Sequence, residues 1–190
     1  MNLADDETTA VESVINRFAK TWTLLLQYDE DSLVRPKQLY AAQMAPDYEK
    51  AKRAIAILKT KLTKRGEAGD LFGFERDYQL QGILGNINQT FDGKDVYPSA
   101  EEKAACLLYF VIKDHPFSDG NKRIGSLLFL LFLDENGLLE KSGLNENGLV
   151  TLALLIAESD PRQKDLLIRL ALNLLSNTNF EPDKSTQFSD

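Results

Sequence analysis

The stretch "HPFSDGNKRIG", residues 115–125, holds the only histidine of the 190-residue chain and stands directly before a long apolar run. Pro116 disfavours helical backbone in the residue before it, so a helix upstream must end near Asp114. The apolar run after Gly120, which includes "SLLFLLFL" at 126–133, is typical of a buried helix. The sequence therefore predicts a polar loop between two helices.

Both flanking helices have recognisable ends. Ser99 is a good N-cap for the upstream helix, and the acids that follow it complement the positive end of a helix dipole. The downstream helix is expected to stop at Asn136-Gly137. Two more helices are predicted, over 145–160 and 161–177, with Pro161 ending the first.

The residues before the loop predict three further helices and one hairpin. Apolar residues at spacings of three and four predict helices over 7–28, over 38–62 with a break at Pro46, and over 74–87. The stretch "NQTFDGKDVYP", which begins at residue 88, predicts a small β-hairpin because Asp92-Gly93 suits a turn with positive φ. The fold class is therefore all-α with one hairpin.

Composition argues against several classes of protein. There are 29 acids and 22 bases, the formal charge is -7, and the bases are interspersed with acids, so nucleic acid is not the expected partner. No apolar run is long enough to cross a membrane, and the acidic start lacks the apolar core of a signal peptide. The single cysteine, Cys106, lies in an apolar run, which favours a reducing, cytoplasmic location.

The start of the downstream helix has the features of an anion site. The first N–H groups of a helix have no intrahelical acceptor, and here Gly120 and Asn121 precede two adjacent cations, Lys122 and Arg123. An acid beside a phosphate cradle suits Mg²⁺, which makes Asp119 the candidate metal ligand. Histidine exchanges a proton near neutral pH, so His115 is the candidate general base.

Each of these residues also has an ordinary structural interpretation. A lone histidine is more often structural or merely exposed than catalytic, adjacent cations are usually solvated, Asp-Gly is usually a turn, and Phe117 alone is a core residue. Their joint occurrence in this order within nine residues favours the functional interpretation.

The stretch "HPFSDGNKR" resembles the signature of the Fic/Doc (Fido) family: His, any, Phe, any, Asp or Glu, Gly, Asn, Gly, Arg, two of any, Arg. The resemblance extends over roughly 70–180 and implies a Fic-type helical bundle with a hairpin flap at 88–97 before the motif at 115–126. The sequence around this motif also resembles the carboxy-terminal part of bacterial virulence RhuM-like proteins. Residues 1–69 would then be a helical extension packed on the core, and 181–190 a flexible tail.

The resemblance implies that a phosphate-containing group, usually AMP, moves from ATP to a hydroxyl of a target protein with the help of Mg²⁺. His115 would be the general base, Phe117 the anchor of the loop, and Asp119 the metal ligand. Gly120, Asn121, Lys122 and Arg123 would surround the phosphates. The flap, with Thr90, Phe91, Asp92, Gly93 and Lys94, would dock the target by strand addition.

Two departures from the pattern leave the reaction open. Lys122 stands where AMP-transferring members have a second glycine, and Ser126 stands where they have the final arginine. With Lys122 at this position the chain resembles the Doc branch of the family, which is known for transfer of the γ-phosphate. AMP transfer, phosphate transfer and a non-catalytic nucleotide-binding module are therefore the alternatives, in that order.

The partners implied are a target protein, with an antitoxin and a homo-oligomer left open. The stretch "SGLNEN" at 142–147 formally matches the inhibitory pattern of many relatives. The arginine with which that glutamate would pair is replaced by Ser126, so a cap for the next helix is the expected role and no self-inhibition is inferred.

Overall fold

The computed structural model describes residues 3–176, and the chain divides into two compact units between Val34 and Arg35. The division into an extension, residues 1–69, and a Fic/Doc core, residues 70–180, stays a prediction, and the predicted tail at 181–190 lies outside the described residues. The packing of an amino-terminal extension on the core also stays a prediction.

The first unit contains two helices, α1 (Leu3–Arg17) and α2 (Ala19–Asp29). The prediction of one helix over 7–28 was wrong at Phe18, where ψ rises to 16° and interrupts the helix. Neither Pro nor Gly marks this break in the sequence. The apolar side chains at helical spacing are between 44% and 58% exposed, and they are Val11, Val14, Ile15, Phe18, Trp22, Leu25 and Leu26.

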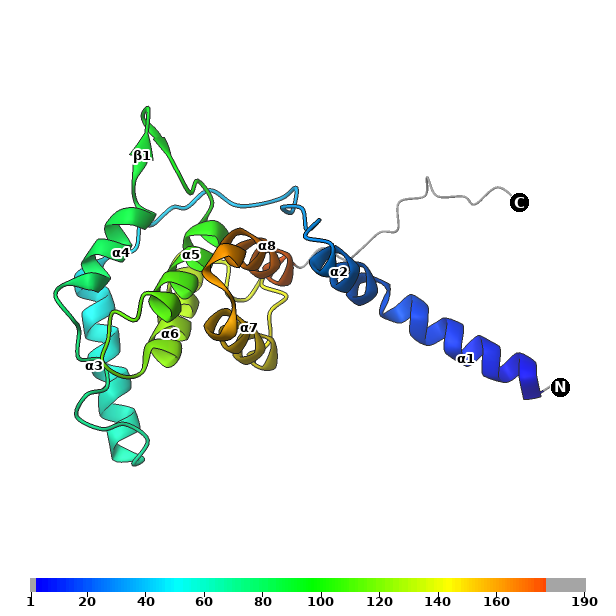
Figure 1. Cartoon of the computed structure of the whole chain (residues 1–190), viewed down its shortest axis with the longest axis horizontal. Helices are drawn as coiled ribbons and strands as arrows, with labels where there is room; N and C mark the ends of the chain where they lie inside the picture. The colour runs from blue at the N-terminus through cyan, green and yellow to red at the C-terminus, as the bar shows by residue number, and fades with distance from the viewer. Residues whose placement is uncertain (1–2, 177–190) are drawn as a thin grey trace. The chain divides into compact units, whose positions relative to one another are not determined.

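The second unit is a helical bundle around α5 (Ala100–Lys113), with α4 (Gln79–Ile87), α6 (Asn121–Glu135), α7 (Glu146–Glu158) and α8 (Lys164–Leu175) packed on it (Figure 1). A short 3-10 turn, η1 (Pro161–Gln163), leads into α8. Helix α3 (Tyr48–Lys64) packs on α4 and α6. All residues of α5 except Phe110 and Lys113 are buried, which makes this helix the centre of the core.

The predicted helix ends around the motif loop are confirmed. Ser99 caps α5 by accepting the Glu102 N–H at 3.1 Å, and Asp114 is the C-cap. Helix α6 begins at Asn121, and Asn136 closes it before Gly137, whose φ is +65°. Asn145 caps α7 by accepting the Gly148 N–H at 2.8 Å, so "SGLNEN" contains the helix cap that the sequence predicted.

The hairpin is also present, with two residues in each strand. Strand β1 (Thr90–Phe91) pairs antiparallel with β2 (Lys94–Asp95), in the register Thr90 to Asp95 and Phe91 to Lys94. Asp92 and Gly93 both have positive φ, 49° and 72°. The turn chemistry read from the sequence is therefore confirmed.

Residues 38–47 are not helical, which corrects the helix predicted from residue 38. Their backbone is satisfied elsewhere: the Tyr40 N–H donates to the carboxylate of Glu101 at 3.0 Å and the Gln43 N–H donates to Asn136 Oδ1 at 2.9 Å. The helix starts only after Asp47, whose side chain accepts the Lys50 N–H at 2.7 Å, and it ends before Gly66 as predicted. Tertiary acceptors have replaced helical hydrogen bonds here.

Helix α4 begins later than the predicted residue 74, because residues 72–76 pair with the motif loop instead of forming a helical turn.

The distribution of charge also differs from the prediction, because the cations are not interspersed with acids along the whole chain. Residues 48–65, which contain α3, hold seven lysines and arginines and one acid. Among the described residues, none of the helices is long and apolar enough to span a membrane.

Candidate active site

The motif loop, residues 115–120, connects α5 to α6 and is paired on one side with residues 72–76. Isolated bridges join Phe72 to Asp119 and Glu75 to Phe117. Three backbone hydrogen bonds support them: the Gly73 N–H donates to the Asp119 carbonyl at 3.1 Å, the Arg76 N–H to the Pro116 carbonyl at 2.8 Å, and the Ser118 N–H to the Phe74 carbonyl at 2.9 Å. Backbone pairing therefore sets the shape of the loop.

Phe117 lies in the core with an exposed fraction of 1%, where the anchor role requires it. Its backbone is held by Asn121, the first residue of α6. The Phe117 N–H donates to Asn121 Oδ1 at 2.9 Å, and Asn121 Nδ2 donates to the Phe117 carbonyl at 2.8 Å. The oxygen and the nitrogen of this buried amide both bind the loop backbone, so the Asn121 side chain holds the loop in place.

His115 is exposed and has a left-handed backbone, with φ at 50°. The sequence explains why a right-handed helical turn is disfavoured here, since Pro116 follows. Its Nδ1 lies 3.3 Å from Asn121 Nδ2. The imidazole thus stands at the surface beside the start of α6, and the chain does not bury it.

Gly120 has a φ of +89° and is the N-cap of α6, with no side chain capping the first turn. A Cβ at this position would lie 2.4 Å from Cε2 of Phe72, a fully buried ring. Glycine adopts this left-handed backbone without steric strain. The structure adds a second reason, because the Phe72 ring occupies the space of a side chain.

Arg123 is held in place by three groups. Its Nη1 donates to the Glu67 carbonyl at 2.7 Å, its guanidinium carbon lies 4.6 Å from the centroid of the Phe72 ring, and its Nη2 lies 3.6 Å from Asp119 Oδ2. The side chains of Arg123 and Asp119 are 44% and 50% exposed. Because a stacked and hydrogen-bonded guanidinium loses little freedom on binding, Arg123 is prepared for an anion.

These residues surround a cavity of about 320 Å³, lined by His115, Ser118, Asp119, Gly120, Asn121, Lys122 and Arg123. This size is in the range of small-molecule pockets. The cavity thus brings together every residue that the sequence analysis assigned to base, metal and phosphate. The flap residues Thr90, Phe91, Asp92, Gly93 and Lys94 do not line it.

The flap is connected to the core through its second strand. Lys103 is buried in α5, and its ammonium lies 2.9 Å from Asp95 Oδ2 and 3.4 Å from the Ile87 carbonyl. The strand residues themselves are exposed, and Phe91 is 80% exposed. An exposed strand edge of this kind is suited to pairing with an extended segment of another chain.

The donor set around Asp119 fits Mg²⁺ bound with a nucleotide better than a metal held by protein alone. Within residues 3–176, no group of three or more His, Cys, Asp or Glu side chains could hold a metal. Mg²⁺ commonly takes one or two carboxylates and completes its shell with phosphate oxygens and water. A single half-exposed carboxylate in a cavity with cations meets that description.

Sequence reasoning missed the supports of the site, Phe72 and the carbonyl of Glu67. The available signal was "LFGF" at 71–74, where Gly73 separates two aromatic residues. A Cβ on Gly73 would lie 2.8 Å from Cγ2 of Ile55, so this glycine allows a close approach to α3. The φ of Gly73 is +67°, so the chain turns at this glycine just before residue 74, where the predicted helix was to begin.

A comparison with protein-family models matches residues 37–133 to the Fic/DOC family. The match covers just over half of the chain and includes α3, the flap, α5, the motif loop and most of α6. The chain therefore belongs to the Fic/DOC family, and it is a Fic-type protein-modifying enzyme in the general sense of a family whose members are typically transferases. No curated protein and no solved structure gave a match.

Proposed function

We propose that the chain transfers AMP from ATP to a hydroxyl group of a target protein. The observation that carries this proposal is the cavity in which His115, Asp119 and Arg123 meet at the uncapped start of α6. The α-phosphate would lie against the first N–H groups of that helix, where partial positive charge favours an anion. Arg123, already stacked on Phe72, would neutralise charge that develops on the phosphate oxygens.

In the proposed reaction the hydroxyl oxygen attacks the α-phosphorus and a new O–P bond forms. The bond from that phosphorus to the bridging oxygen breaks, pyrophosphate leaves, and the hydroxyl proton passes to His115. For Nε2 to accept this proton, the neutral ring must carry its other proton on Nδ1, so in that tautomer Nδ1 does not accept a hydrogen bond from Asn121 Nδ2, 3.3 Å away. Mg²⁺ at Asp119 would neutralise phosphate charge.

The second candidate is transfer of the γ-phosphate, and one observation favours it. Lys122 lines the cavity in the place of the second glycine of the AMP-transferring pattern, and its side chain is exposed. A lysine there takes up space and adds charge, which would favour the opposite direction of the bound nucleotide. A module that binds nucleotide without catalysis is the third candidate.

Labelling distinguishes the three candidates. The purified chain is incubated with Mg²⁺, a cell lysate and ATP labelled at either the α- or the γ-phosphate. Label transferred to protein only from the α position supports AMP transfer, and label only from the γ position supports phosphorylation. Calorimetric binding of ATP without either label supports the module.

Two variants complete the test. His115→Ala should lower transfer by about 10²- to 10⁴-fold, the usual contribution of general acid–base catalysis. Asp134→Asn, an exposed change near the other end of α6, is the matched control and should transfer normally. Full activity in His115→Ala would remove the histidine from the mechanism.

A further inference from the structure

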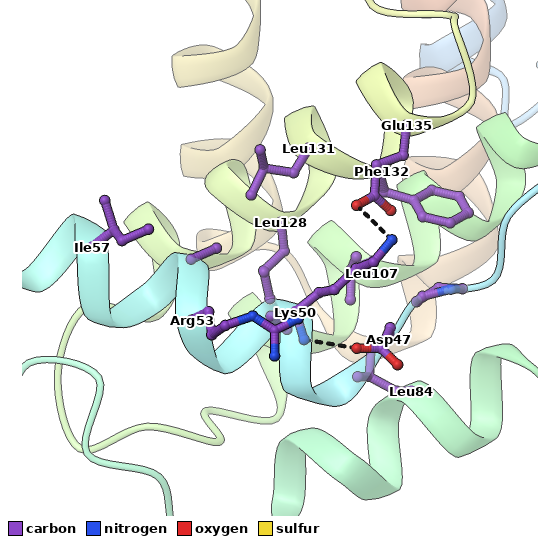
Figure 2. Close-up of a pocket in the computed structure, with 13 residues that line it drawn as sticks. Asp47, Lys50, Arg53, Ile57, Leu84, Leu107, Leu128, Leu131, Phe132 and Glu135 are labelled. Carbon is purple, nitrogen blue, oxygen red and sulfur yellow. Dashed lines mark hydrogen bonds and ion pairs between the residues drawn. The ribbon is translucent and has the colours of Figure 1, made fainter.

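The cavities away from the motif loop differ in charge. A groove between α3 and α6 has a volume of about 280 Å³ and an apolar lining that includes Leu128 and Phe132 (Figure 2). Its charged lining residues are two acids and two bases, namely Asp47, Glu135, Lys50 and Arg53. Lys50 pairs with Glu135 at 3.2 Å. This groove therefore has no excess of either charge.

A smaller cavity, of about 130 Å³, lies beside the start of α8 and is basic. Three cations, one acid, one phenol and one apolar side chain line it, and they are Arg35, Lys164, Arg169, Asp165, Tyr97 and Ile168. All six residues belong to the second unit, so the cavity is formed without residues 1–34. Its basic lining contrasts with the formal charge of the chain, which is -7.

The acids near this cavity do not cancel its positive charge. Asp165 Oδ1 lies 3.9 Å from Lys164 Nζ, but the Asp165 side chain is 79% exposed, so water screens much of its charge. Glu102 forms an ion pair with Arg35 and does not line the cavity. The three cations still outnumber these two acids.

Two of the cations are held in place before any ligand binds. The Glu102 carboxylate that pairs with Arg35 is buried in α5, and its Oε2 also accepts a hydrogen bond from the Ser99 hydroxyl at 3.2 Å. The Lys164 ammonium lies 5.7 Å from the centroid of the Phe110 ring. Because these groups already have limited freedom, less of it is lost when an anion binds.

We propose that this cavity binds a small oxyanion, with phosphate as the representative ligand. Guanidinium and ammonium groups are the side chains that usually bind phosphate oxygens. The cavity is well below about 300 Å³, the lower end for cavities that hold drug-sized ligands, so a single phosphate group fits it better than a nucleotide. It shares no residue with the anion cavity at α6, and the inference is independent of the reaction proposed above.

The first experiment records the backbone amide signals of the isotope-labelled full chain by NMR while inorganic phosphate is added. The amides of Tyr97, Lys164 and Asp165 should shift and saturate with a dissociation constant of their own. Signals at the start of α6 report on the anion cavity separately, so binding at one site cannot be mistaken for binding at the other. Potassium chloride at the same ionic strength is the control and should give no saturating shifts.

The phosphate group can come from free phosphate or from a phosphorylated side chain, and a second titration with O-phosphoserine distinguishes these sources. Weaker binding of O-phosphoserine than of inorganic phosphate assigns the cavity to free phosphate. Tighter binding of O-phosphoserine assigns it to a phosphorylated side chain.

Single substitutions test the charges that line the cavity. Lys164→Gln should raise the dissociation constant for phosphate by about 5- to 20-fold, because a charged hydrogen bond is lost at a partly exposed site. Asp165→Asn should lower it by about 2- to 5-fold, because an exposed acid no longer repels the anion. Arg35 is left unchanged, since its removal would leave the buried Glu102 carboxylate without its cation.

Arg162→Gln is the matched control. It removes a cation two residues before Lys164, but the Arg162 side chain is 89% exposed and does not line the cavity. The dissociation constant for phosphate should therefore change by less than about 2-fold, because exposed charges are screened by salt.

Four results would overturn the proposal. They are amides of Tyr97, Lys164 and Asp165 that do not respond to phosphate, an unchanged dissociation constant in Lys164→Gln, an equal rise in Arg162→Gln, and weaker binding in Asp165→Asn. Circular dichroism of every variant should match that of the wild type. If Lys164→Gln fails to fold, the exposed Asp165→Asn change still tests the proposal, since it predicts the opposite sign.

Discussion

The motif loop and the flap hairpin are both short, irregular segments next to α5, and their chain supports them in opposite ways. The loop is paired with residues 72–76 and anchored by the buried Phe117. The side-chain amide of Asn121 also binds its backbone through both the oxygen and the nitrogen. The flap has two residue pairs, an exposed Phe91 and one anchoring cation at Lys103. This difference fits the proposed roles, because catalysis would need fixed groups in the loop, whereas docking of a target segment would need an edge that can adapt.

The largest expected effect is on the loop anchor. Phe117→Ala should lower the free energy of unfolding by about 3–5 kcal/mol, because a fully buried ring leaves a cavity. Chemical denaturation measures this change, and ATP binding should weaken in the same variant. A loss below about 1 kcal/mol would mean that Phe117 does not anchor the loop.

Gly120→Ala should cost about 2–3 kcal/mol, since alanine strains a left-handed backbone and its Cβ meets the Phe72 ring. The matched control is Gly93→Ala in the flap turn, where φ is +72° and no atom lies within 4 Å of the added Cβ. In that variant only the strain of the left-handed backbone should lower the free energy of unfolding. Equal losses in the two variants, measured by thermal unfolding, would contradict the contact with Phe72.

Lys103→Met should cost about 1–2 kcal/mol through the lost charged hydrogen bonds to Asp95 and the Ile87 carbonyl. The amides of Thr90–Asp95 should exchange hydrogen faster, while those of the motif loop keep their protection. Lys94→Met, an exposed change within the flap, is the control. Unchanged exchange in the flap would show that Lys103 is not its anchor.

Stability above pH 10 should report on the support of the loop. The Tyr48 hydroxyl donates to Glu75 Oε2 at 2.7 Å, and this hydrogen bond, together with burial and the negative charge of Glu75, raises the pKa of Tyr48 to about 12. The neutral phenol is favoured in the folded state, so its contribution is present below pH 10 and is lost as the pH rises through 12. Tyr48→Phe should flatten this part of the stability curve, and an identical slope would contradict the assignment.

The smallest effect on stability is expected at the flap tip. Phe91→Ala should change the free energy of unfolding by less than about 0.5 kcal/mol, because the ring is 80% exposed. If the flap docks the target, the KM for the target should rise while ATP binding is unchanged. A large loss of stability would mean that the flap is part of the core.

Local chemistry made several elements predictable from the sequence. The caps of α5 and α6 depend on Ser99, Gly120 and Asn136, and the hairpin turn depends on Asp92-Gly93. The residues that form each cap or turn therefore lie within a few positions of it in the sequence. The candidate site was predictable for the same reason. Its residues from His115 to Arg123 are consecutive or nearly so, and one loop with one helix start brings them together.

The errors have a common cause in long-range contacts. Residues 38–47 have apolar periodicity, yet Glu101 and Asn136 supply acceptors that a local pattern cannot reveal. Residues 74–78 left the predicted helix because the motif loop, some 40 residues away, offers backbone partners. The contacts of Phe72 and Glu67 with Arg123 were not predicted, because these residues are separated from Arg123 by a similar distance along the chain.

By itself, the sequence determined the ends of α5 and α6, the hairpin turn and which residues line the candidate site, because capping, turn formation and motif spacing act over a few residues. The tertiary structure alone decided how that site is held rigid, through Phe72, Asn121 and the pairing of residues 72–76. It also showed that the cations of α3 border an apolar groove. Packing brings together residues that are distant in sequence, and no local pattern encodes that distance.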